Sequence, residues 1–107
     1  MLIVRTFRIM TAMALLVTTA PAGAAKIEIV MQNLVITPAE VQAKVGDTIE
    51  WVNKDIVAHT ATTQQSGDFD VMLPANKSGS LVLNKAGTFP YSCRFHPNMK
   101  ATLVVAP

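Results

Sequence analysis

Cysteine is almost absent from this chain of 107 residues, which contains only Cys93. Because an internal disulfide needs two cysteines, the disulfide framework that stabilises many small exported domains is excluded. A lone thiol in an oxidising compartment is a liability unless it is buried or occupied. The presence of Cys93 therefore requires a structural or chemical explanation.

An excess of charge of one sign is also lacking. Without Arg5 and Arg8, which lie in the amino-terminal segment, the chain has seven basic and seven acidic residues. A domain with no basic surplus has no electrostatic reason to bind nucleic acid or anionic lipid. We therefore expect neither as a partner.

The amino-terminal segment has the order of a secretory signal peptide. Arg5 and Arg8 precede an apolar run over about residues 9–20, and Pro21 and three small residues follow. The run is too short to span a bilayer by itself. We predict a signal peptide over residues 1–24, export to the periplasm and no membrane span in the mature form. Cleavage after Ala25, or retention as an anchor lengthened by residues 2–4, are the alternatives.

From residue 25 onward, apolar residues alternate with polar ones, which is the pattern of β-strands. The pattern predicts strands over residues 27–31, 41–45, 48–52, 58–62, 80–83, 88–93 and 101–105. Glycines and prolines lie between these segments at turn spacing, and no window of ten or more residues has a helical period. Seven or eight short strands predict one all-β domain over residues 25–107, a sandwich or a small barrel.

The residues with metal-binding chemistry lie near the carboxyl terminus. Cys93, His96 and Met99 recur at intervals of three residues between two predicted strands. A thiolate, an imidazole and a thioether together suit copper better than calcium, magnesium or a structural zinc. Two imidazoles and a thiolate in a plane, with a weak axial thioether, form the blue-copper arrangement. The loop therefore supplies three of its four ligands.

The second imidazole can come only from His59, the one other histidine. It follows the predicted strand of Trp51, where an adjacent strand could carry it to the loop. Both histidines and the only cysteine are then used. His59 is thus assigned by elimination, whereas the other three are linked by their spacing.

These segments resemble the cupredoxin family. Residues 46–53, then His59 and Thr60, then residues 91–93 and 96–99 are similar to its motifs, and the resemblance covers essentially residues 25–107. The short Cys-x-x-His-x-x-Met loop is similar to the amicyanin branch; plastocyanins and pseudoazurins have longer loops. The resemblance implies a Greek-key β-sandwich with one copper ion at one end. The copper ligands that it implies are His59, Cys93, His96 and Met99.

Two positions depart from the family pattern. The residue after the first histidine is often an asparagine that braces the ligand loop, and here it is Thr60. The position two after the axial methionine is often glycine, and here it is Ala101. Neither change removes a ligand, but both leave the bracing of the loop, and with it the reduction potential, open.

The predicted function is one-electron transfer between exported redox proteins, with copper cycling between Cu(II) and Cu(I). His59 would be the interior ligand and His96 the surface ligand through which the electron passes. The partners would be a cytochrome, a dehydrogenase or an oxidase, and we expect a monomer. Because the ligand set leaves no spare acid, base or open metal position, we expect no enzymatic activity.

An apolar patch is expected around the metal end, formed by Met72, Leu73, Pro74 and Pro97. Met72 is also a conceivable substitute axial ligand, although it has no spacing relation to the other donors. Trp51, Phe69 and Phe89 are expected in the core.

One alternative function stays open. A copper delivery or resistance protein would use similar ligands and exchange its metal readily, although no methionine-rich or histidine-rich tract favours it. A Cys–His hydrolase would need an orienting residue and an oxyanion hole, for which we find no motif. Two histidines cannot build a further copper centre, and a thioether is a poor zinc ligand.

Overall fold

The structure is a computed structural model that describes residues 23–65 and 67–107. Most of the predicted signal peptide therefore lies outside the described residues. Over the described ranges the chain forms nine strands and no helix. The strands are β1 (Lys26–Gln32), β2 (Val35–Thr37), β3 (Glu40–Lys44), β4 (Thr48–Asn53), β5 (His59–Thr63), β6 (Asp70–Leu73), β7 (Ser78–Val82), β8 (Gly87–Ser92) and β9 (Lys100–Ala106). No described segment forms a helix that could cross a membrane.

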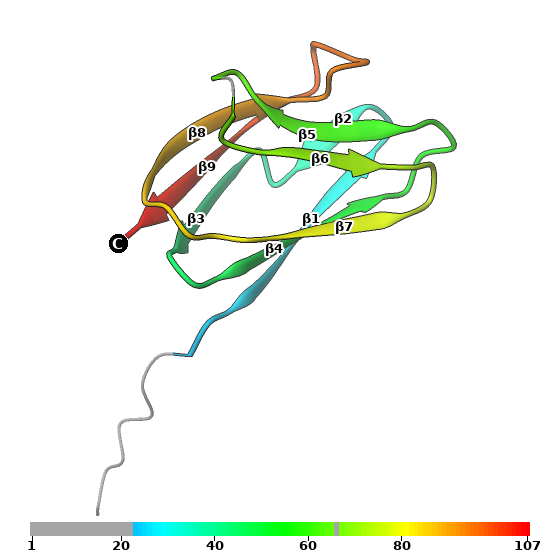
Figure 1. The fold of residues 1–107 in the computed structure, drawn as a ribbon. Helices are drawn as coiled ribbons and strands as arrows, with labels where there is room; N and C mark the ends of the chain where they lie inside the picture. The colour runs from blue at the N-terminus through cyan, green and yellow to red at the C-terminus, as the bar shows by residue number, and fades with distance from the viewer. Residues whose placement is uncertain (1–22, 66) are drawn as a thin grey trace, which may run out of the picture.

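The strands form two sheets (Figure 1), with the orders β2-β1-β4-β7 and β3-β9-β8-β5-β6. The pairs β1–β4 and β3–β9 are parallel, and the other pairs are antiparallel. The predicted β-sandwich is confirmed. Two strands, β2 and β6, have no counterpart among the predicted segments. Both are short, with three and four residues, so their sequences offer too few alternations to be recognised.

The core lies between the sheets and follows the alternation of the sequence. In β4, Ile49 and Trp51 are fully buried while their neighbours are partly exposed. Trp51 Nε1–H donates to the Tyr91 hydroxyl across the core at 3.2 Å. Phe69 packs against both aromatic rings, but it is only partly buried and lies at the margin of the core. Burial raises the pKa of Tyr91 to about 12.

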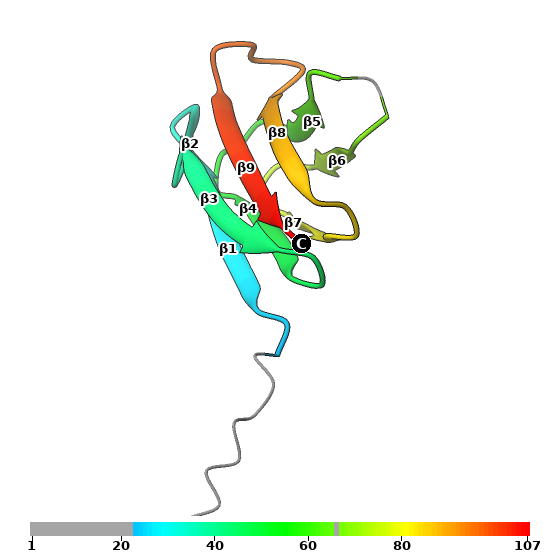
Figure 2. The ribbon, with the colours of Figure 1, turned by 90° about the vertical axis from the view of Figure 1, so that its left-hand side faces the viewer.

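One end of the sandwich gathers three connections. The β8–β9 loop lies at the end of the sandwich opposite to the carboxyl terminus (Figure 2). The β1–β2 turn joins this end through Asp55 of the β4–β5 connection, which accepts the N–H groups of Asn33 and Leu34 at 2.7 and 3.2 Å. Both turn residues have positive φ angles, 54° and 60°. The same carboxylate reaches His59, so the ligand region and this turn share an anchor.

Candidate metal centre

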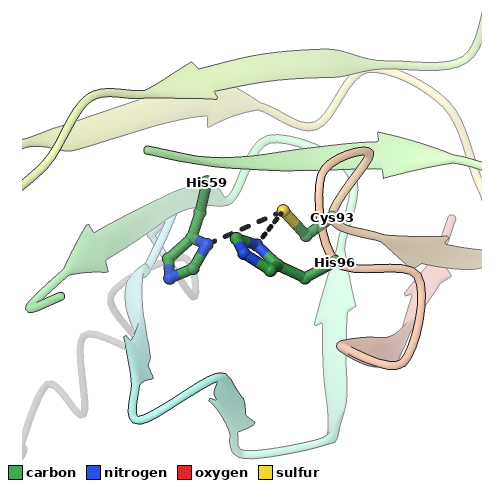
Figure 3. Close-up of side chains that lie close together, drawn as sticks. All are labelled: His59, Cys93 and His96. Carbon is green, nitrogen blue, oxygen red and sulfur yellow. Dashed lines mark hydrogen bonds between the residues drawn. The ribbon is translucent and has the colours of Figure 1, made fainter. Parts of the chain in front are cut away.

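Three side chains that could bind a metal converge at this end of the sandwich (Figure 3). His59 is the first residue of β5, Cys93 follows β8 directly, and His96 lies in the β8–β9 loop. Cys93 Sγ is 3.7 Å from His59 Nδ1 and 3.6 Å from His96 Nδ1. One ligand atom from each residue lies within 4.8 Å of the others. The arrangement presents one cysteine sulfur and two imidazole nitrogens to a common point.

The two histidines differ in their exposure to solvent. His59 and Cys93 are completely buried, whereas His96 is partly exposed. The two rings stand nearly at right angles, with an interplanar angle of 74° and centroids 5.0 Å apart. Only the His96 ring therefore offers an edge to the surface.

The loop that follows Cys93 is built from hydrogen bonds at its three-residue spacing. The N–H of His96 donates to the Cys93 carbonyl at 3.3 Å, and the N–H of Met99 donates to the His96 carbonyl at 2.9 Å. The N–H of Cys93 returns to the Met99 carbonyl at 3.1 Å. Met99 is thus buried beside Cys93, with 2% of its surface exposed. Met72 is 48% exposed and does not share this interior position.

The chemistry of these donors matches copper. A family model of the cupredoxin-like domain matches residues 6–105. The chain belongs to the cupredoxin family.

Relatives and solved structures agree with this assignment. Amicyanin-alpha of Methylorubrum extorquens is 34% identical over 94 residues, which cover 83% of this chain and 77% of the relative. Methylamine utilization protein MauL of the same organism is 28% identical over 105 residues, covering 95% of this chain and 92% of that protein. A Cu(I) structure of an amicyanin variant superposes with a TM-score of 0.67 at 27% identity, covering 75% and 81% of the two chains. The ion that suits this cupredoxin is therefore a single copper ion.

Asp55 is the contact residue that motif reasoning missed. Its Oδ2 lies 2.7 Å from His59 Nε2, on the ring nitrogen that faces away from Cys93. If Nε2 carries the proton and donates it to the carboxylate, Nδ1 is left free to bind a metal. This hydrogen bond holds the pKa of Asp55 below its usual range, against the effect of burial, and the N–H bonds from Asn33 and Leu34 assist. The only sequence signal was an acidic residue four positions before the histidine.

Thr60 takes over the bracing that family members often assign to asparagine. The backbone N–H of Arg94, the residue after Cys93, donates to Thr60 Oγ1 at 2.9 Å. Thr60 is completely buried, and its hydroxyl is 2.8 Å from the hydroxyl of Thr62. Thr62 in turn donates to Asp70 at 2.8 Å. A carboxylate only accepts, so the Thr62 hydroxyl donates its hydrogen to Asp70 and accepts the hydrogen of Thr60. The lone pairs of Thr60 Oγ1 are then free to accept the N–H of Arg94.

Arg94 closes this network at the surface. Its guanidinium group is 3.4 Å from Asp70 Oδ1, and both side chains are half exposed. An exposed pair of this kind adds little stability by itself.

The second departure from the family pattern, Ala101, is an ordinary buried position of β9 opposite Tyr91. The bracing of the loop, left open by the sequence, therefore comes from Thr60.

The apolar patch differs in part from the expected one. Leu73 is completely buried, so its assignment to the patch is wrong, because in β6 its side chain points into the core while its neighbour Met72 points outward. Met72, Pro74 and Pro97 are exposed. A shallow hollow beside His96 is lined by Leu34, Phe95, His96, Pro97, Asn98 and Met99. The sequence alone did not indicate Leu34 or Phe95, which are 51% and 53% exposed.

Proposed function

We propose that this cupredoxin is a periplasmic one-electron carrier whose copper ion is bound by His59, Cys93, His96 and Met99. The single observation that carries the proposal is the convergence of two imidazoles and the only thiol at one end of a rigid sandwich. When bound, copper supplies a one-electron couple between Cu(II) and Cu(I). Export rests on the signal-peptide pattern of residues 1–24.

The chain's own residues hold the donors in place so that little has to move when the oxidation state changes. His59 is buried and anchored by Asp55, and Cys93 is buried and anchored through the loop bonds. The core on which both rest contains the Trp51–Tyr91 hydrogen bond. A stiff donor set keeps the reorganisation cost of electron transfer low.

His96 is the surface contact of the proposed site. Its partly exposed ring lies beside exposed apolar side chains, Leu34, Phe95 and Pro97. An apolar surface around a donor ring lets a partner approach without stripping water from charged groups. We propose that the partner is a redox protein that docks here. Because one relative is named as a methylamine utilization protein, a dehydrogenase or a cytochrome of methylamine oxidation is the partner class that we favour.

The donor set leaves no group for catalysis, and we propose that the protein is not an enzyme. The carboxylate that contacts the site, Asp55, is occupied by His59 and two backbone N–H groups. A copper delivery role would require the metal to leave readily, and the complete burial of His59 and Cys93 opposes that.

The test starts from the chain that begins at Ala25. Addition of Cu(II) should produce an intense blue thiolate charge-transfer band and a reversible one-electron voltammogram, and Cys93→Ser should abolish the band. Met99→Ala should alter the potential, whereas the matched control Met72→Ala, at an exposed methionine, should not. A colourless complex that loses copper readily to a chelator would refute the carrier and favour delivery.

A further inference from the structure

The backbone of Ala25, one residue before β1, is hydrogen-bonded on both sides to the β3–β4 region. The N–H of Ala25 donates to Asp47 Oδ1 at 2.9 Å, and its carbonyl accepts the N–H of Thr48 at 2.9 Å. Lys26 then begins the parallel pairing of β1 with β4, opposite Thr48. Gly23 and Ala24 are exposed, and the Gly23 carbonyl accepts the Lys44 ammonium group at 3.4 Å.

The partner of Ala25 is a nearly buried carboxylate. Only 4% of the Asp47 side chain is exposed. Besides Ala25, it accepts the backbone N–H of Lys44 at 3.0 Å and the Lys44 ammonium at 3.1 Å. The N–H groups of Ala25 and Lys44 hold its pKa below the usual range, so the carboxylate is ionised at neutral pH. The Lys44 side chain is 40% exposed, so its ammonium group is partly screened by solvent.

We infer that cleavage between Ala24 and Ala25 places a new α-ammonium group against Asp47, forming an ion pair that the uncleaved chain lacks. Water adds across the peptide bond, so that Ala24 leaves with a carboxylate and Ala25 keeps the nitrogen, which is protonated at neutral pH. The nitrogen already lies at hydrogen-bond distance, and the change converts a neutral donor into a charged one. Processing by a signal peptidase would thus strengthen the fold as it releases the domain.

The geometry also discriminates between the two cleavage positions that the sequence leaves open. Cleavage after Ala25 would remove both backbone hydrogen bonds of this residue and move the charge to Lys26. Retention of the segment as an anchor would leave a neutral peptide N–H at Ala25. Only a chain that begins at Ala25 brings the charge to the carboxylate. The inference does not depend on copper, and the metal-free protein tests it.

The experiment compares the chain that begins at Ala25 with a free amine and the same chain N-acetylated. Acetylation keeps an N–H donor toward Asp47 but removes the charge, so it isolates the ion pair. We expect acetylation to lower the melting temperature of the metal-free protein by roughly 5 °C, the effect of losing one such interaction in a domain of this size. In the Asp47→Asn background acetylation should have no effect. In the control Glu50→Gln, which breaks the neighbouring Lys26–Glu50 pair, it should still lower the melting temperature.

A second measurement keeps the inference testable if Asp47→Asn does not fold. The precursor is exported with its own leader, and the intact mass of the product is measured. The inference is supported if the intact mass is that of a chain beginning at Ala25 and the effect of acetylation on the melting temperature weakens in high salt. A product that begins elsewhere, or equal melting temperatures for the free and acetylated chains, overturns it. Neither result would bear on the proposed copper site, which is tested separately by the blue charge-transfer band.

Discussion

Replacement of Asp55 by asparagine tests how the protein sets the electronic properties of its site. Asp55→Asn keeps a side-chain oxygen that can accept the His59 Nε2–H but removes a negative charge that is only 13% exposed. A negative charge beside a ligand stabilises the more positive Cu(II) state and makes the imidazole a stronger donor. The variant should therefore have a higher reduction potential and bind Cu(II) less tightly.

The magnitude follows from the geometry. Because one imidazole ring separates them, the carboxylate lies about 7 Å from the centre of the three donor atoms, and an effective dielectric constant of about 20 then gives about 2 kcal/mol. Partial solvent screening lowers this energy to about 1 kcal/mol. For a one-electron couple, the two limits correspond to an increase of roughly 40–90 mV.

The measurement is voltammetry of the copper-loaded protein, combined with its visible spectrum. The matched control is Asp68→Asn. Asp68 lies in the β5–β6 connection, beyond the end of β5 that is far from His59, and its carboxylate pairs with Lys85. The control should leave the potential nearly unchanged. If Asp55→Asn retains the blue band and has the potential of the parent protein, the proposed role of this carboxylate is wrong.

Three further outcomes are expected. Thr60→Val leaves the N–H of Arg94 without its acceptor. It should therefore shift the copper–thiolate band and lower the free energy of unfolding by about 1–3 kcal/mol. The control Thr88→Val, at an exposed site, should do neither. Tyr91→Phe leaves the buried Trp51 N–H unpaired and should cost about 1–3 kcal/mol in urea unfolding of the metal-free protein; no loss would show that this hydrogen bond is not stabilising. Since burial raises the pKa of Tyr91 to about 12, the stabilising neutral form is fully present below pH ~10 and is lost as the pH rises through 12. The free energy of unfolding should therefore fall by about 3 kcal/mol over this interval, and Tyr91→Phe should abolish the fall.

Much of the fold was accessible from the sequence because the strands alternate regularly. Ile49 and Trp51 in β4 have the period-two pattern that predicted them as core, and both are completely buried. The alternation did not predict short strands, or strands in which consecutive residues are all apolar. In β6, Val71, Met72 and Leu73 are all apolar, so hydropathy could not tell which side chain faces inward. The structure assigns Leu73 to the core and Met72 to the surface.

The contacts that support the site were less accessible. Asp55 reaches the Asn33 turn from 22 residues away, and Thr60 accepts the N–H of Arg94 from 34 residues away. Asp55 belongs to no recognisable motif, because an acidic residue between two strands is ordinarily a solvated or capping residue. Thr60 lies within the family motif, but at a position where asparagine is usual. The replacement of an asparagine by Thr60 could be noticed in the sequence, but its consequence could not be decided there.

The sequence by itself determined which donors are available and how three of them are spaced. One thiol, two imidazoles and the Cys-x-x-His-x-x-Met interval restrict the chemistry to a soft metal, because ligand type and local spacing are properties of the chain. The tertiary structure alone decided that Nδ1 of His59 faces Cys93, and that Asp55 and Thr60 support the site. These features depend on packing between segments distant in the chain, and no local pattern encodes which side chains meet there.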